Sequence, residues 1–423
     1  MKRNILPWRA LRLLVTAGAA AALMAPAVAE AQPPSAEPAS STAPAPGGEV
    51  IVRWNETATS VLTPSGRPLL TQPFVVTAMH VAMYDAVVAV EGSYEPFTSH
   101  LTAPPDASST AAAAAAARRV LVGFLPDQAA SFDAALAATL ADVPDGPAED
   151  AGVAVGEAAG WGVLAARYAD GTQNGPSPAL PPPGPGVWQP TPPATAGLTP
   201  WLATARPYTM SSPDRYRPDP PGLESGRHRR DLDEVRRLGG AASTERTAEQ
   251  TEIARFWSDQ PIAQNQRTLR NHATVLGWGI APTARLFAAV MTSEADALIA
   301  CWDAKYHHLR WRPWQSIPAV EAGWKPLLGT PNHPEFPSAH GCLTGALAHS
   351  LAQVTGTDQL ELTVDATTTG TTRRYATVDQ LVREVGDARI WGGLHYRSSV
   401  DAGTRIAERV VRHNLNHNFQ PAH

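Results

Sequence analysis

The chain has 423 residues, of which 43% are hydrophobic and 17% are charged, so it can bury a sizeable core. Its formal net charge of −5 excludes a global electrostatic attraction to nucleic acid or to an anionic membrane. Any anion site must therefore be local.

The first 31 residues have the pattern of an export signal. Basic residues Lys2 and Arg3 precede a short apolar run over 13–24, and a small-residue cleavage pattern follows at 27–31. The run is short for a membrane span, and an uncleaved anchor is the alternative. We therefore expect a signal peptide over 1–31 and a secreted or periplasmic mature chain that is free of the membrane.

One large domain is expected after the signal. Residues 32–48 are mostly Pro, Ala, Ser and Gly without periodicity, which predicts a flexible leader, and the domain is expected over 49–423. Hydrophobic periodicity then predicts helices over 74–90, 111–124, 128–141 and 148–168. Asp127 or Ser131 is expected to cap the third of these helices.

Nine prolines fall between Pro176 and Pro193, and they predict an irregular loop over 171–200. The loop could separate two domains. A long surface excursion is favoured, because the helical segments on either side show no independent boundary.

Helical patterning resumes after the loop. The predicted helical segments are 226–238, 248–258, 271–294, 296–310, 341–355, 378–390 and 402–414. Few segments alternate at period two, so strand content should be low and the fold class all-α. Cys301 and Cys342 could form a disulfide in an exported protein, or they could be two small buried hydrophobic residues.

The first chemical motif runs from Lys305 to Arg312 and is followed by Pro313. Seven residues make almost two helical turns, so both cations would share one helix face, and Pro313 would end or kink the segment. An anion between the cations would offset their repulsion, and Arg presents a planar fork to tetrahedral oxygens. For the pair alone, a solvated basic face is the commoner outcome.

The second motif holds His333, Pro337, Ser338 and His340. A helix is predicted to begin at Ser338 or just after it, and a Ser hydroxyl with free backbone N–H groups suits an anion. His340 would lie beside the anion, where it could exchange a proton near neutral pH. A Ser cap with an exposed His is the alternative.

The third motif contains Arg389, Gly392, Gly393 and His395. The two glycines break the helical pattern and allow close approach of the backbone. Arg389 can supply a third cation, and His395 can act as a nucleophile or a ligand through one imidazole nitrogen. A helix-ending turn with a core His is the alternative.

In this order the three motifs resemble the signature of the vanadium haloperoxidase and type 2 acid phosphatase superfamily. Segments 79–85, 301–306 and 391–396 also resemble its bacterial secreted vanadium haloperoxidase-like branch, over about residues 50–415. The resemblance implies an all-α domain in which helices of two adjoining bundles converge on one pocket. It leaves a homodimer open, because relatives are often dimeric.

The resemblance also implies the residues that hold the cofactor, vanadate, or phosphate in the same pocket. Lys305, Arg312 and Arg389 would bind the equatorial oxygens of the anion. The Ser338 hydroxyl and the backbone N–H of Ala339 would add two donors.

Catalytic roles follow from the same resemblance. His340 would be the acid or base near the apical oxygen, and His395 would coordinate vanadium in a peroxidase or attack phosphorus in a phosphatase. Trp302 and His333 are candidates for the halide side of the pocket, with ordinary packing as the alternative.

Two positions depart from the family pattern. Ala339 stands where the family usually has Gly, which would strain the backbone if φ were positive there. Ser399 stands where an Asp often orients the final His. Asp401 could reach His395 after a local shift, or Ser399 or a backbone carbonyl could take the orienting task.

Three functions are therefore expected, in order. The first is a secreted vanadium-dependent haloperoxidase that oxidises halide with hydrogen peroxide, with an organic acceptor as the final substrate. The second is a secreted acid phosphatase that acts on a phosphomonoester with His395 as nucleophile. The third is a non-catalytic oxyanion-binding protein, which the departures at Ala339 and Ser399 motivate. None of the three involves nucleic acid.

Overall fold

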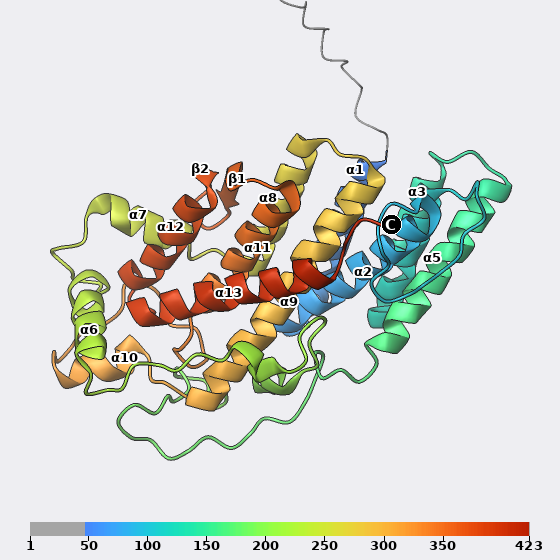
Figure 1. Cartoon of the computed structure of the whole chain (residues 1–423). Helices are drawn as coiled ribbons and strands as arrows, with labels where there is room; N and C mark the ends of the chain where they lie inside the picture. Colours follow the sequence, from blue (N-terminus) through green and yellow to red (C-terminus); the bar gives the residue numbers. More distant parts are fainter. Residues whose placement is uncertain (1–46, 423) are drawn as a thin grey trace, which may run out of the picture. The chain divides into compact units, whose positions relative to one another are not determined.

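The computed structural model describes residues 47–422, so the predicted signal peptide and almost all of the leader lie outside the described residues. The helices are α1 Gly48–Leu62, α2 Gln72–Glu91, α3 Ser109–Phe124, α4 Ala129–Leu140, α5 Pro147–Ala166, α6 Gly226–Leu238, α7 Ala248–Phe256, α8 Pro261–Leu276, α9 Ile280–His308, α10 Pro313–Ser316, α11 Ala339–Thr355, α12 Val378–Trp391 and α13 Arg397–His417. One antiparallel hairpin, β1 Gln359–Ala366 with β2 Thr371–Thr377, accompanies them (Figure 1). The all-α prediction is confirmed.

Two long helices form the centre of the core. Every residue over 73–88 of α2 and over 286–305 of α9 is buried. With the turn before it, α2 is long and apolar enough to cross a membrane, but 89% of its apolar window is buried inside the protein, as in a core helix. Because α9 contacts α2 on one side and α11 on the other, it joins the helices from the two halves of the chain (Figure 1).

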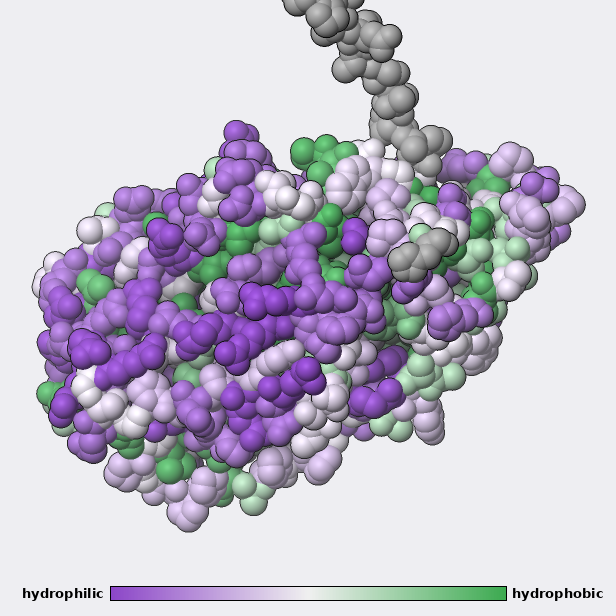
Figure 2. Space-filling view, in the orientation of Figure 1, coloured by the Kyte–Doolittle hydropathy of each residue, from purple (hydrophilic) through white to green (hydrophobic). Residues whose placement is uncertain are grey.

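The C-terminal helix α13 covers the core with one face. Ile406 and Val410 are buried, whereas Arg405, Arg409 and Arg412 are exposed at the helical spacing between them. Figure 2 shows that hydrophilic residues dominate the surface over α13. The same helix packs against α11, which carries part of the candidate site.

The predicted helix over 271–294 is wrong. α8 ends at Leu276, Gly277 takes a left-handed φ of 58° as its C-cap, and α9 begins at Ile280. Apolar residues lie on both sides of Gly277, so the hydrophobic pattern runs through the break that this residue makes. The predicted caps of α4 are also wrong, since Gln128 occupies its N-cap and no side chain makes a capping hydrogen bond.

The loop over 171–200 is irregular, as predicted, and it is tied to the segments that carry the first two motifs. The N–H of Trp188 donates to the carbonyl of Leu309 (2.7 Å), and the N–H of Leu198 donates to the carbonyl of Asn332 (2.8 Å). In return, the Leu198 carbonyl accepts hydrogen bonds from Trp302 and Tyr306. The loop therefore lies beside the chemical motifs.

Candidate active site

Three buried cations meet at the ends of three different helices. Lys305 lies in the last turn of α9, Arg312 is the N-cap residue of α10, and Arg389 lies in the last turn of α12. Their exposed fractions are 0%, 0% and 3%. The structure brings together these three residues, which the sequence motifs singled out, and they lie close enough to lower the pKa of the same two histidines.

The predicted shared helix face of Lys305 and Arg312 is wrong. α9 ends at His308, and Leu309 takes a left-handed φ of 47°, so the chain turns before it reaches Arg312. Pro313 begins α10 instead of ending a helix, a position that suits its fixed φ. A reversal of the chain brings the two cations together, and helical periodicity has no part in it.

Burial destabilises the charged form of each cation. It lowers the pKa of Lys305 to about 8, that of Arg312 to about 10 and that of Arg389 to about 9, and the charge of Arg312 adds to the effect on the other two. Like charges in a site shielded from water repel each other strongly. A bound anion would offset both the burial and the repulsion.

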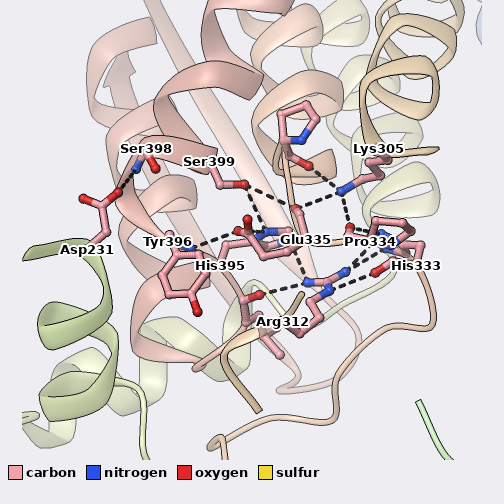
Figure 3. A network of polar contacts seen from close by, with 12 residues as sticks. Asp231, Lys305, Arg312, His333, Pro334, Glu335, His395, Tyr396, Ser398 and Ser399 are labelled. Atoms are coloured by element: carbon pink, nitrogen blue, oxygen red, sulfur yellow. Dashed lines mark hydrogen bonds and ion pairs between the residues drawn. The ribbon is translucent and has the colours of Figure 1, made fainter. Parts of the chain in front are cut away.

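Lys305 and Arg312 also hold the backbone of the second motif (Figure 3). Lys305 Nζ donates to the carbonyls of Pro334 (2.9 Å) and Glu335 (3.1 Å) and to that of Pro337. Arg312 Nε donates to the carbonyl of His333 (2.9 Å). The cations therefore fix the segment that leads into α11.

Ser338 and His340 lie at the start of α11, as predicted. Ser338 is the N-cap residue, but its hydroxyl makes no capping hydrogen bond, so the alternative of a Ser cap is not realised. His340 is buried, which excludes the exposed His of that alternative. Ala339 is the first helical residue and has a negative φ; a methyl group at this position causes no backbone strain.

Three buried polar atoms around this point have no hydrogen-bond partner among the described residues: Ser338 Oγ, His340 Nε2 and Arg389 Nε. Buried polar groups nearly always have a partner. Ser338 Oγ and Arg389 Nε can both donate a hydrogen bond. The N-terminus of α11 beside them adds N–H groups that lack partners within a helix. The arrangement suits a small oxyanion.

His395 follows the turn after α12. Gly393 has a φ of 76°, and a Cβ there would lie 2.4 Å from the carbonyl oxygen of Gly239, so only glycine fits this turn. Burial, followed by the charges of Arg312 and Lys305, holds the pKa of His395 well below its usual value. Burial and the charge of Arg389 do the same for His340. Both imidazoles are neutral near pH 7.

The acid beside His395 is Glu335, which the sequence analysis did not single out. Its Oε1 lies 2.9 Å from His395 Nδ1, whereas Asp401 pairs with Arg227 instead (3.1 Å). The suggestion that Asp401 reaches His395 is therefore wrong. Ser399 Oγ lies 3.4 Å from the same nitrogen, so the other suggestion, that Ser399 helps to orient His395, agrees with the structure. The only feature of the sequence that could have indicated Glu335 is its position between two prolines of the second motif, Pro334 and Pro337.

A cavity of about 590 Å³ opens onto these groups. His340, His395, Arg389 and Ala339 lie in its wall, and Trp302 and His333, whose ring centroids are 5.0 Å apart, line it as well. The rest of the wall is largely apolar, with Leu69, Leu70, Leu198, Ile262, Leu328, Leu343 and Leu394. Residues 258–262, at the end of the link from α7 and the start of α8, also line the cavity, and no sequence motif indicated them.

Cys301 and Cys342 lie behind the site, on α9 and in the first turn of α11, and both are buried and free. The two thiols lie close enough to affect each other's pKa, so the two residues are neighbours. The structure agrees with the alternative of two small buried residues.

Comparison with known proteins agrees with the resemblance seen in the motifs. Residues 285–422 match the family VCPO second helical-bundle domain, and this stretch contains every predicted site residue. None of the curated proteins matches the sequence.

Solved structures with the same fold include bacterial vanadium-dependent peroxidases. A vanadium-dependent iodoperoxidase is 24% identical, with a TM-score of 0.74 over 89% of this chain and 97% of that chain. A bacterial vanadium-dependent chloroperoxidase is 17% identical; its apo form gives a TM-score of 0.67 over 82% of this chain and 93% of that chain. Its holo form gives 0.65 over 82% and 91%. This chain therefore shares the fold of these enzymes.

Proposed function

We propose that this chain, which has the fold of the vanadium haloperoxidases, is itself a vanadium-dependent haloperoxidase that oxidises a halide with hydrogen peroxide. The observation that carries the proposal is the set of buried polar atoms without partners beside three buried cations. The named activities of the structural neighbours support it.

The residues present fit vanadate. Lys305, Arg312 and Arg389 would balance its negative charge, and Ser338 Oγ would donate to one of its oxygens. His395 Nε2 accepts a hydrogen bond from Arg312 Nη1 (3.1 Å), so this nitrogen carries a lone pair, which a vanadium centre would take in place of the Arg312 N–H. Phosphate has the same shape and charge, and it would compete for the same donors.

Vanadate, when bound, would activate hydrogen peroxide toward attack by a halide. The protein residues would hold the anion, keep His395 in place and move protons. The neutral imidazole of His340 has an unpartnered Nε2 at the cavity, so it can accept a proton from peroxide and return it later. The apolar wall of the cavity would limit access of water and admit an organic acceptor.

The two departures from the family pattern do not favour the non-catalytic alternative. Ala339 has an unstrained helical backbone, and a carboxylate, that of Glu335, contacts His395 although Ser399 replaces the usual Asp. The phosphatase alternative uses the same groups, with His395 Nε2 as nucleophile. It is therefore an outcome of the experiment below.

The experiment compares two reactions in the purified mature chain. Iodide and bromide oxidation by hydrogen peroxide is followed with and without orthovanadate, alongside hydrolysis of p-nitrophenyl phosphate. We expect halide oxidation that depends on vanadate and is lost in His395→Ala. The exposed His417 gives a matched control, and His417→Ala should retain the activity. Hydrolysis without halide oxidation would establish a phosphatase, and vanadate binding without either reaction would establish the third function.

We also propose that the chain is exported and acts outside the cytoplasm. The signal-like pattern of residues 1–31 supports this proposal. N-terminal sequencing of the protein from the periplasm or medium of a bacterial host tests this. A mature N-terminus near residue 30 is expected, and an intact N-terminus on a cytoplasmic protein would contradict it.

A further inference from the structure

Glu335 is a buried carboxylate whose side chain faces the imidazole of His395. It is 2% exposed, and its Oε1 lies 2.9 Å from His395 Nδ1 while accepting the N–H of Tyr396 (3.0 Å) (Figure 3). Burial of a carboxylate is unfavourable unless charge or hydrogen bonds compensate. Burial raises the pKa of Glu335, and the hydrogen bond from Tyr396 and the charges of Arg312 and Lys305 offset part of this effect.

The contacts on both sides of the His395 ring fix where its proton lies. Arg312 Nη1 is 3.1 Å from Nε2, and because a guanidinium can only donate, Nε2 must accept. A neutral imidazole then carries its proton on Nδ1. Glu335 Oε1, which also accepts the N–H of Tyr396, must therefore accept from Nδ1.

We propose that Glu335 is the positioning residue of the site, which holds His395 with its proton on Nδ1 and its Nε2 lone pair toward the bound oxyanion. The proposal rests on the proposed function for the identity of the oxyanion. Glu335 acts through His395 and does not touch the substrate. A partner of this kind typically changes ligand affinity about 10- to 100-fold when it is removed.

The backbone of Glu335 is held independently of its carboxylate. Its carbonyl accepts from Lys305 Nζ (3.1 Å) and from Ser399 Oγ (3.3 Å), and its N–H donates to the carbonyl of Arg310 (2.9 Å). Truncation of the side chain should therefore leave the segment in place. The Ser399 hydroxyl is itself 3.4 Å from His395 Nδ1, so a carboxylate at position 399 could reach the same proton.

This second approach to Nδ1 gives a rescue experiment with Glu335→Ala, Ser399→Asp and the double variant. We expect Glu335→Ala to weaken orthovanadate binding about 10- to 100-fold, measured by calorimetry without peroxide or halide. The double variant should recover to within about threefold of wild type. Ser399→Asp alone should bind more weakly than wild type, because two carboxylates would then share one buried site.

The second readout needs no vanadate. Nitrogen-15 NMR of histidine-labelled protein reports which ring nitrogen of His395 carries the proton, with the signal assigned through His395→Ala. Wild type and the double variant should show Nδ1–H, and Glu335→Ala a mixture of tautomers. Glu335→Gln keeps the volume and an acceptor oxygen, so it should fold as wild type does, retain Nδ1–H and bind less than tenfold more weakly.

The outcomes separate this inference from the proposed function. If wild type binds no vanadate but the tautomer depends on Glu335 as described, the cofactor assignment fails and the positioning role stands. If Glu335→Ala keeps the Nδ1–H tautomer, or if the double variant is no better than Glu335→Ala, the positioning role is wrong. Asp401→Asn, which removes an acid paired with Arg227, is the control and should match wild type in both measurements.

Discussion

Replacing Glu294 by Gln should remove a pH-dependent weakness from the core. Glu294 lies in the middle of α9, is 4% exposed and accepts one hydrogen bond, from Asn265 Nδ2 (2.6 Å). Two positions along, Asp296 accepts the N–H groups of residues 208–210 and the hydroxyl of Thr209. Glu294 therefore has much less support for a negative charge than its neighbour.

The structure gives both the sign and the size of the effect. Burial raises the pKa of Glu294 from 4.5 to about 8, so between these pH values the folded chain holds a proton that the unfolded chain has released. Stability must then fall as the pH rises through this window. At about 1.4 kcal/mol per pKa unit the loss is at most roughly 5 kcal/mol. Relaxation and water penetration reduce it, and we expect about 2–4 kcal/mol.

The amide introduced by Glu294→Gln has no such proton to lose. The free energy of unfolding of the variant should therefore increase relative to that of wild type as the pH rises. The measurement is urea unfolding of both proteins from pH 4.5 to 8.5, followed by tryptophan fluorescence. The exposed Glu252 on α7 gives the matched control, Glu252→Gln, whose curve should parallel wild type. A Glu294→Gln curve that also runs parallel to wild type would refute the reasoning.

Three further changes test the site and its turn. Ser338→Ala should weaken orthovanadate binding by about 10- to 100-fold, which corresponds to the loss of one hydrogen bond to a charged group. It should not lower Tm, because the hydroxyl has no partner in the described structure. Calorimetry measures the affinity and thermal melts measure Tm, and an unchanged affinity would contradict the prediction. Phosphate affinity should fall as the pH rises above about 8, where Lys305 loses its proton, and Lys305→Arg should flatten this fall in a pH series of titrations. Gly393→Ala should lower the unfolding free energy by more than the roughly 1–3 kcal/mol of a strained φ alone, since its Cβ would meet the Gly239 carbonyl. The control is Gly370→Ala, because Gly370 has a φ of 66° and open space around it, so this variant should show the φ effect alone. Equal losses of unfolding free energy in urea would contradict the clash at Gly393.

Hydrophobic periodicity predicted most of the helices because their buried faces are continuous. Residues 74–90 and 378–390, for example, fall within α2 and α12. It failed where two apolar helices follow each other directly, at Gly277, because a short break leaves the pattern intact. It also failed between Lys305 and Arg312, where the spacing suits a helix but the chain turns at Leu309.

The candidate site was predictable wherever a residue carried a local motif. Ser338 and His340 share the start of α11, and Arg389 and His395 flank one turn, so spacing alone was informative. Glu335 lies 60 residues before His395, and only the fold brings the two together. Residues 258–262 carry no recognisable motif, because they contribute to the cavity by lining its wall, and their place there depends on the fold.

The loop over 171–200 shows how a long irregular segment can serve as part of a cavity wall. Proline restricts the unfolded chain as much as the folded one, so the nine prolines between Pro176 and Pro193 reduce the conformational entropy that the loop loses on folding. A few backbone hydrogen bonds, such as that from Leu198 to Asn332, are then enough to hold it. The hydrogen bonds to α9 use the backbone carbonyl of Leu198, so a change of the Leu198 side chain would reshape the cavity wall and keep these contacts. Substrate choice could therefore diverge between relatives while the anion site stays the same.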